Sequence, residues 1–371
     1  MIYADNAATT QLAPEALAAM MPYLQTEYGN ASQLYSFSRG TKKALREARE
    51  VIASCINALP EEIYFTSGGT ESDNWALKGT MLVYGDYRAL ITSQIEHHAV
   101  LHSAKTIEKM GYPVAYLPVD ECGIVSTKTL TKHITDNTKL VSVMFSNNEV
   151  GTVEPIKELA AIAHKSGALF HTDAVQAVGH VPINVRELNV DMLSASAHKF
   201  NGPKGIGFLY VKKGCEIKPY EDGGSQEFGM RAGTENVAAI VGMATALQLS
   251  VCKLQENKRK LLSLEQQLID SLDRAGVDFI RNGALNHVPG NINLSFRGYE
   301  GETLLHRLDL KGICISTGSA CDSKNTQVSH VLQAMHIDNE YILGTIRVSL
   351  GPSNTSDEVK KISDAIISIV K

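Results

Sequence analysis

The sequence predicts an α/β fold in which a largely parallel sheet is followed by a smaller α+β unit. Short β-branched runs alternate with longer helical patterns along the first part of the 371 residues, as is typical of a parallel sheet covered by helices. The expected strands are continuous apolar runs, which indicates a sheet buried on both faces. Seven strands are expected, at residues 63–66, 89–92, 114–117, 140–145, 169–172, 192–195 and 208–211.

Helical patterns separate these strands, among them residues 41–57, 72–78, 101–109 and 156–164. One long helical stretch rich in Lys, Glu, Gln and Leu is expected over residues 237–272. After it come three more candidate strands, at 291–296, 312–316 and 346–350, and a closing amphipathic helix at 356–370. We therefore expect a large domain over residues 13–255 and a small domain built from residues 1–12 and 256–371.

Composition and charge exclude several classes of protein. Hydrophobic residues make up 44% and charged residues 20% of the chain, which is a globular and not a disordered composition. The formal net charge of −5 gives no overall attraction for nucleic acid, and no apolar run approaches the ~18 residues that a membrane-spanning helix needs. The first residues show no export signal, and the six cysteines include no Cys-x-x-Cys pair. We expect reduced thiols and a cytoplasmic protein without a nucleic-acid or membrane partner.

Glycine and hydroxyl residues follow the first expected strand. The segment reads Ser67-Gly68-Gly69-Thr70-Glu71-Ser72 and opens a helical pattern, so its backbone N–H groups and the helix dipole favour an anion such as phosphate. It has neither the lysine of a Walker A loop nor a Gly-x-Gly-x-x-Gly spacing, and nucleotide is therefore not favoured. The alternative is a purely structural turn with a hydroxyl cap.

Two further side chains come directly after expected strands. Asp173 follows residues 169–172 and is either a helix cap or a buried carboxylate that holds a proton on a heteroaromatic nitrogen. Lys199 comes just after residues 192–195, among small and glycine-rich neighbours, and is either a surface lysine or a desolvated amine able to form a Schiff base. Ligands of open α/β sheets bind beyond the carboxyl ends of the strands. A phosphate cradle, a carboxylate and an amine at that edge are together what pyridoxal 5′-phosphate (PLP) requires.

Seven motifs stand at residues 5–10 (DNAATT), 66–74 (TSGGTESDN), 96–97 (EH), 148–152 (NEVGT), 196–199 (SAHK), 231–234 (RAGT) and 316–321 (STGSAC). Together they resemble those of the cysteine desulfurases, in the NifS/IscS-like branch of the class V aminotransferase family. The resemblance covers essentially the whole chain. It implies the PLP-dependent transferase fold (fold type I), with a seven-stranded, mostly parallel sheet in the large domain. It also implies PLP as the cofactor and a homodimer with shared sites.

The resemblance implies catalytic roles for Lys199, His97 and Cys321. Lys199 would carry PLP and shuttle a proton, and His97 would stack on the ring. Asp173 would pair with the pyridine nitrogen, which it keeps protonated. The remaining cofactor contacts would come from Gln176 and Asn148 at the ring oxygen and from Gly69, Thr70, Ser196 and His198 at the phosphate, with Thr234 added across the dimer interface.

The substrate implied by the resemblance is L-cysteine, whose carboxylate Arg347 would clamp with help from Asn30. The alternative for Arg347 is a strand residue held in a salt bridge. No metal ligand is implied, apart from Cys321 as a transient ligand of an iron–sulfur cluster.

Cys321 differs from the other cysteines in its neighbours. Residues 316–324 are otherwise small or polar, whereas Cys314 lies between two isoleucines. We expect residues 316–329 to form a mobile loop that carries a reactive thiol. In the family, such a thiol attacks the sulfur of the substrate, keeps it as a persulfide for an acceptor protein, and L-alanine is released.

Three positions depart from the family pattern, and two other functions compete with this one. Ala31 and Tyr35 stand where the family has a proline and a histidine, and Phe228 stands where it has a basic residue. A selenocysteine lyase, or another class V aminotransferase-like enzyme, would not depend on a loop cysteine. A sulfur-carrier scaffold without activity would not need Lys199, Asp173 and Gln176. The acceptor of the sulfur, whether an iron–sulfur scaffold protein or a tRNA-thiolating enzyme, is not identified by the sequence.

Overall fold

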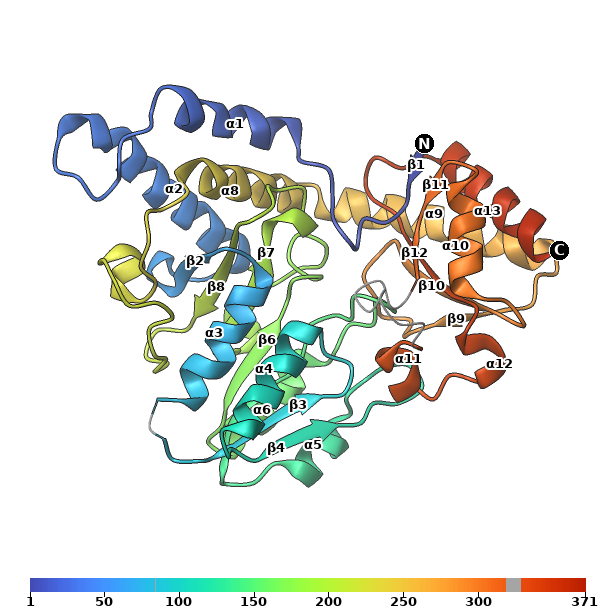
Figure 1. Ribbon diagram of the computed structural model, residues 1–371, viewed down its shortest axis with the longest axis horizontal. Helices are drawn as coiled ribbons and strands as arrows, with labels where there is room; N and C mark the ends of the chain where they lie inside the picture. Colours follow the sequence, from blue (N-terminus) through green and yellow to red (C-terminus); the bar gives the residue numbers. More distant parts are fainter. Residues whose placement is uncertain (84, 318–327) are drawn as a thin grey trace.

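The computed structural model describes residues 1–83, 85–317 and 328–371 (Figure 1). Among these residues, seven strands form the central sheet of the larger part of the molecule, in the order β2-β8-β7-β6-β5-β3-β4. Strand β8 runs antiparallel to both of its neighbours, and the other pairs are parallel. The predicted seven-stranded, mostly parallel sheet is therefore confirmed. Its strands are β2 (Ile63–Thr66), β3 (Ala89–Ser93), β4 (Val114–Leu117), β5 (Thr138–Ser142), β6 (Leu169–Asp173), β7 (Met192–Ser196) and β8 (Gly207–Val211).

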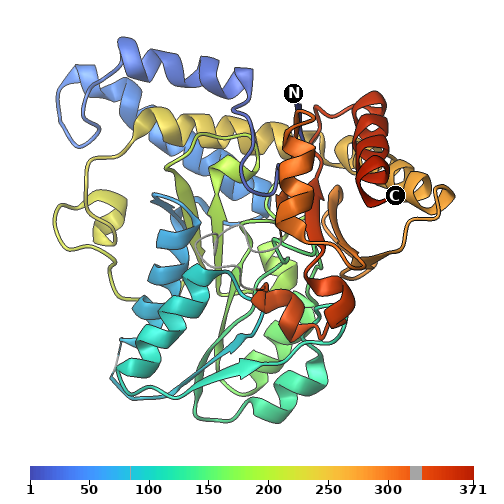
Figure 2. The same cartoon turned by 45° about the vertical axis from the view of Figure 1, so that its right-hand side comes forward.

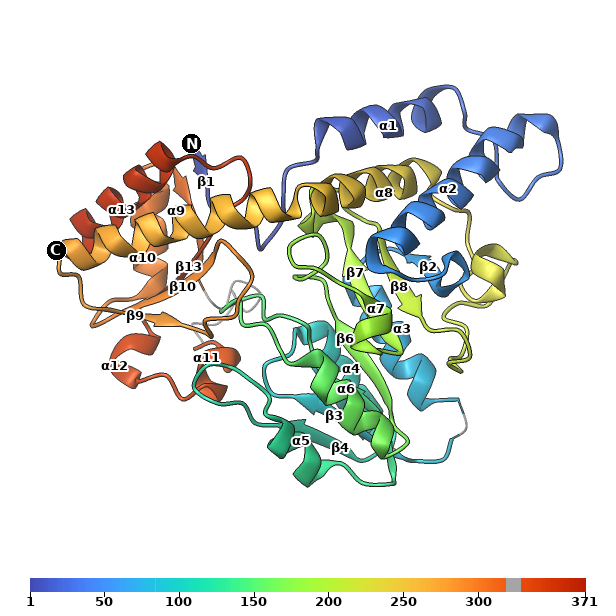
Figure 3. The same ribbon diagram turned by 180° about the vertical axis from the view of Figure 1, so that it is seen from behind.

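Helices cover both faces of this sheet, which explains its continuous apolar strands. Helices α3 (Gly69–Met81) and α4 (His98–Lys109) lie in front of it in Figure 1. Helices α2 (Arg39–Ile56), α6 (Ile156–Lys165) and α7 (Val185–Leu188) lie on the opposite face, which Figure 3 turns toward the viewer. The remaining elements of this part are α1 (Pro14–Gln25), α5 (Thr127–His133) and the short 3₁₀ turns η1 (Ser36–Ser38), η2 (Pro60–Glu62), η3 (Ala197–Lys199) and η4 (Gln226–Gly229).

A second, antiparallel sheet stands beside the carboxyl ends of the first (Figure 2). Within the described residues it has four strands in the order β12-β13-β10-β9. Helices α9 and α13 pack side by side against it. The elements of this part are α9 (Leu254–Arg274), β9 (Phe279–Asn282), β10 (Asn291–Phe296), α10 (Gly301–Asp309), β11 (Ile313–Cys314), β12 (Ser316–Thr317), α11 (His330–Ala334), α12 (Asn339–Ile342), β13 (Thr345–Ser349) and α13 (Ser356–Val370).

The single helix predicted over residues 237–272 is wrong. The chain forms α8 (Val237–Cys252) and α9, which are bent by 68° at Lys253. Each helix buries its side chains against a different core: α8 packs on α1 and α2, whereas Leu261, Leu264 and Leu268 of α9 pack in the smaller core. The bend therefore marks the passage from one core to the other. Within the described residues no single helix has the length and apolarity of a membrane crossing, although this bent pair reaches both by length and composition.

The N-terminal residues join the two parts. Strand β1 (Ile2–Tyr3) pairs in parallel with β11, and Ala4 lies in the smaller core. Residues 5–10 then pass between the two parts before α1 begins on the larger one (Figure 2). We propose that the two cores correspond to a large domain at 13–255 and a small domain at 1–12 and 256–371, with α11 and α12 packed back against the larger core.

Candidate active site

A cavity of about 610 Å³ lies where the carboxyl ends of the central strands meet the smaller part. Side chains from after β2, β3, β5, β6 and β7 line it on one side, and Arg347 of β13 lines it on the other. This is the edge at which parallel sheets bind ligands. The predicted site residues that line it are Gly69, Thr70, His97, Asn148, Asp173, Gln176, Ser196, His198, Lys199 and Arg347.

The N-terminus of α3 opens into the cavity without a side-chain cap among the described residues. Gly68 precedes the helix at φ +147°, a conformation that favours glycine. A Cβ atom on Gly69 would lie 2.5 Å from Cγ2 of Val175, so the absence of a side chain lets the helix end approach the loop after β6. Backbone N–H groups at such a helix end form an anion site.

The side-chain amine of Lys199 is held by two carbonyl groups of the N-terminal residues. Its Nζ donates to the carbonyl oxygens of Ala7 at 2.7 Å and Ala8 at 2.8 Å. The carbonyl of Ala7 also accepts from Nε2 of Gln176 at 2.9 Å. Residues 5–10 were matched to the family without individual roles, and no pattern in a single sequence indicates that their carbonyl groups form a wall of the site.

His97 is uncharged at neutral pH. It is the N-cap of α4, and its Nδ1 accepts a hydrogen bond from the N–H of Ala99 at 3.1 Å. Burial, and then the charge of Lys199, lower the pKa of His97 to about 4. The proton of the neutral ring therefore lies on Nε2, since Nδ1 is the acceptor.

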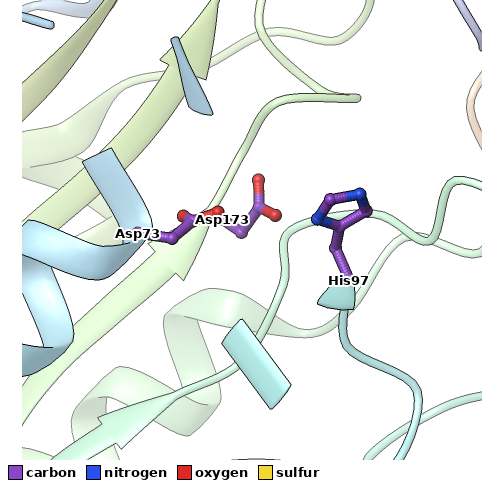
Figure 4. Close-up of side chains that lie close together, drawn as sticks. All are labelled: Asp73, His97 and Asp173. Carbon is purple, nitrogen blue, oxygen red and sulfur yellow. The ribbon is translucent and has the colours of Figure 1, made fainter. Parts of the chain in front are cut away.

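Asp173 ends β6 and lies beside a second carboxylic acid, Asp73 of α3 (Figure 4). Asp173 Oδ1 accepts from the N–H of Val175 at 2.9 Å, and burial raises the pKa of Asp173 to about 6. One polar atom from each of Asp73, Asp173 and His97 lies within 4.8 Å of the other two. Asp73 was missed in the sequence: it is a central residue of the matched TESDN motif, but no spacing connects it with a residue one hundred positions later.

Arg347 is buried, with 4% of its surface exposed, and its guanidinium has two partners. Nη2 lies 2.7 Å from Oδ1 of Asp5, and Nη1 donates to the carbonyl of Asn148 at 2.8 Å. Among the described residues Nε has no partner. Arg347 is thus a salt-bridged strand residue, which was the alternative to a substrate clamp. It also lines the cavity, and its Nε is a donor without a partner among the described residues.

Two of the predicted residues that the structure describes, Asn30 and Thr234, are not among those that line the cavity. The side chain of Asn30 accepts from the N–H of Ser32 at 2.8 Å in the loop after α1, and Thr234 is exposed before α8. Neither side chain therefore lies at the cavity of its own chain. Cys321 lies outside the described residues.

Comparisons with known proteins agree on one family. The class V aminotransferase model matches residues 2–362. The whole chain is 47% identical to "Cysteine desulfurase IscS" of Methanosarcina thermophila, covering 92% of that protein, and 45% identical to "Putative cysteine desulfurase IscS 1" of Bacillus subtilis, covering 98%. This chain belongs to the cysteine desulfurase family. Among solved structures, a NifS-like protein superposes on this desulfurase with a TM-score of 0.94 at 38% identity, over 99% of this chain and 98% of that one. SspA in complex with cysteine superposes with a TM-score of 0.84 at 34% identity, over 96% and 100%.

Enzymes of this family depend on PLP, and the cavity of the desulfurase fits that cofactor. The uncapped end of α3 suits a phosphate, and the buried carboxyl of Asp173 suits a protonated ring nitrogen. The amine of Lys199 lies in the same cavity and is fixed by two hydrogen bonds. These three groups come from three different strand ends, as the sequence predicted.

Proposed function

We propose that this desulfurase acts as a homodimer that removes the sulfur of L-cysteine, releases L-alanine and holds the sulfur as a persulfide on Cys321. The observation that carries the proposal is the convergence of the Lys199 amine, the Asp173 carboxyl and the open end of α3 in one cavity that also receives Arg347. The family of the chain and the likeness to a structure solved with cysteine support the choice of substrate.

Each residue of the site has a role in this proposal. PLP, when bound, supplies an electron sink for the α-carbon of the substrate. Lys199 Nζ removes and returns the proton at that carbon, and the carbonyl groups of Ala7 and Ala8 hold the amine in place until then. Asp173 keeps the ring nitrogen protonated, and neutral His97 stacks on the ring. The remaining contacts come from Gln176 and Asn148 at the ring oxygen, and from Gly69, Thr70, Ser196 and His198 at the phosphate.

Arg347 binds the carboxylate of the substrate. Its Nε is buried and has no other partner among the described residues, so a carboxylate would satisfy a donor that is otherwise costly to bury. Asp5 and the carbonyl of Asn148 orient the guanidinium through Nη2 and Nη1. We place Asn30 near the same carboxylate as a proposal based on the family motif alone.

The transfer of sulfur from L-cysteine to Cys321 needs no external oxidant. The thiolate of Cys321 attacks the sulfur of L-cysteine and forms the S–S bond of the persulfide. The C–S bond breaks, its electron pair stays with the substrate carbon, and two protons complete L-alanine at that carbon and at the α-carbon. A thiolate of an acceptor protein then takes the outer sulfur of the persulfide, the S–S bond breaks, and the thiolate of Cys321 is regenerated. Iron–sulfur cluster assembly and tRNA thiolation are the proposed destinations of this sulfur.

Exposed apolar side chains support the homodimer. Leu24, Tyr28 and Leu34 are 58%, 75% and 95% exposed, on α1 and the loop that follows it. All three come from one stretch of chain, residues 24–34, and a contiguous patch of such side chains would mark a protein interface. In the homodimer, exposed Thr234 of one subunit would donate to the phosphate in the other, in agreement with its place outside the cavity of its own chain.

Unpaired cysteines support a reducing compartment. Cys55, Cys122, Cys215, Cys252 and Cys314 are free thiols. Disulfides are rare where glutathione and thioredoxin keep thiols reduced, so we propose a cytoplasmic location.

Two variants test the proposal. Borohydride should fix the cofactor on the wild-type chain at Lys199 and leave Lys199→Ala unlabelled, as read by peptide mass; label on another residue would contradict the assignment. Cys321→Ser should bind PLP and L-cysteine and release almost no alanine, whereas Cys314→Ser, the matched control, should keep the wild-type rate. Alanine at the wild-type rate from Cys321→Ser, with reductant present, would favour the selenocysteine lyase or another lyase of this fold.

A further inference from the structure

The carboxyl group of Asp73 lies beside that of Asp173 in the interior of the desulfurase (Figure 4). Asp73 is 1% exposed and Asp173 is 5% exposed. Oδ1 of Asp73 has no hydrogen-bond partner among the described residues. Burial and mutual repulsion each disfavour a second charge on two adjacent buried carboxyl groups. One of the two acids therefore holds a proton at neutral pH.

The groups that face the pair assign this proton to Asp73. Asp173 accepts a backbone N–H, and the nearby positive charge of Lys199 lowers its pKa against the effect of burial. Burial first, and then the charge of Asp173, raise the pKa of Asp73 well above its usual value. Glu96 is another buried acid near the pair, and burial raises its own pKa to about 8, so it is largely protonated at neutral pH and brings no compensating positive charge.

The histidine next to Asp73 provides no compensating charge. Nε2 of His171 lies 3.7 Å from Oδ1 of Asp73. Burial lowers the pKa of His171 to about 3, so the ring is neutral. Both of its nitrogens are already hydrogen-bonded, Nδ1 to Ser142 at 2.9 Å and Nε2 to Ser194 at 3.0 Å. His171 is thus a neutral polar neighbour of Asp73.

We propose that Asp73 is a positioning residue, a neutral carboxylic acid that donates a hydrogen bond to the Asp173 carboxylate and holds that carboxylate toward the pyridine nitrogen of PLP. The inference rests on the proposed role of Asp173. A hydrogen bond to a charged acceptor is shorter and stronger than one between neutral groups, so it fixes the side chain that receives it. The backbone N–H of Val175 and the acid of Asp73 then hold the direction of the Asp173 carboxylate, and together with the charge of Lys199 they favour its charged form.

Substitutions that keep or remove the donor test the proposal. Asparagine has the shape of a neutral aspartic acid and an N–H to donate, so Asp73→Asn should bind PLP within about twofold of the wild type. Asp73→Ala and the larger, apolar Asp73→Leu remove the donor, and the PLP dissociation constant should rise about tenfold, since one charged hydrogen bond is worth about 1.5 kcal/mol or more. Thermal unfolding of each apoprotein measures the structural cost separately, and the leucine variant serves if the alanine variant does not fold.

The ¹⁵N resonance of ring-labelled PLP in the holoenzyme is the second readout. It should report a protonated nitrogen in the wild type and in Asp73→Asn, and should move toward neutral pyridine in Asp73→Ala. Equal losses of affinity in Asp73→Asn and Asp73→Ala would overturn the proposal, because they would show that Asp73 acts as an anion. Wild-type affinity in Asp73→Ala and Asp73→Leu would overturn it as well.

One control separates this inference from its foundation. If Asp173→Asn leaves the ring nitrogen protonated and the affinity for PLP unchanged, the proposed role of Asp173 has failed; if only the Asp73 variants behave as wild type, the inference alone has failed.

Discussion

Glu227→Ala should lower the free energy of unfolding of the large part by about 3–5 kcal/mol, the usual cost of breaking a buried ion pair. The carboxylate of Glu227 receives Arg49 Nη1 and Nη2 at 2.8 and 2.7 Å and the N–H of Phe65 at 2.9 Å. Its side chain is 4% exposed and that of Arg49 is 12% exposed. Without Glu227, the guanidinium would stay buried between the rings of Phe65 and Phe228, which lie 4.2 and 5.1 Å from its central carbon.

The same contacts stabilise an unfavourable backbone conformation at Glu227 and Phe228. Glu227 and Phe228 have φ values of +47° and +60°, which residues with side chains adopt only where their surroundings impose them. Both belong to the segment that leads to Thr234. If Thr234 donates to the cofactor of the partner subunit, Glu227→Ala should weaken PLP binding as well as stability.

Urea unfolding followed by tryptophan fluorescence measures the effect where it occurs. Trp75 is the single tryptophan, is 1% exposed, and contacts Tyr64, whose ring lies 6.1 Å from that of Phe228. Glu50→Ala is the matched control, since it removes the exposed partner of Arg46 at 3.7 Å and should cost less than about 1 kcal/mol. Equal, small costs for Glu227→Ala and Glu50→Ala would refute the reasoning.

Three other perturbations have expected outcomes. Thr234→Ala should weaken PLP binding by roughly tenfold with an unchanged unfolding temperature, as one lost charge-assisted hydrogen bond predicts, and unchanged affinity in the dimer would contradict the shared site. Arg347→Lys should raise KM for L-cysteine at least tenfold with a smaller change in kcat, because a lysine cannot bind a carboxylate through two donors; an unchanged KM would exclude Arg347 as the clamp. Burial lowers the pKa of His171 to about 3 in the folded chain. As the pH falls below about 6.5, His171 therefore binds a proton in the unfolded chain but stays neutral in the folded chain, which favours unfolding. At pH 5 this should cost roughly 2 kcal/mol of stability, and the pH profile of unfolding in His171→Asn should lack this loss.

The sequence was informative where local pattern and local structure coincide. Continuous β-branched runs predicted every strand of the central sheet, because both faces of that sheet are buried and each strand is apolar along its length. The bend at Lys253 was not predictable, since helical periodicity continues across it and only the two separate cores cause the change of direction. Strand β9 (Phe279–Asn282) was missed because its Arg281 and Asn282 interrupt the apolar run.

The candidate site divides in the same way. Asp173 and Lys199 were found because each comes at or just after the end of an apolar strand, where a polar residue is conspicuous. Asp73 is on a helix amid other polar residues, and Asp5 is in an irregular segment, so neither has a neighbourhood that distinguishes it. Their positions follow from long-range packing, which one sequence does not display.

The N-terminal segment explains why groups from both parts of the chain meet in one arrangement. Asp5 holds Arg347 of the second sheet, and the carbonyl of Ala7 receives both Lys199 and Gln176 from the first. The N–H of Ala7 in turn donates to Ser349 on the same strand as Arg347. A shift of one sheet against the other would therefore stretch hydrogen bonds at Arg347 and at Lys199 together. The proposed substrate clamp, Arg347, and the proposed proton carrier, Lys199, are therefore positioned by one short run of residues. This coupling explains why residues 5–10 form a motif, since no single side chain within it contacts both groups.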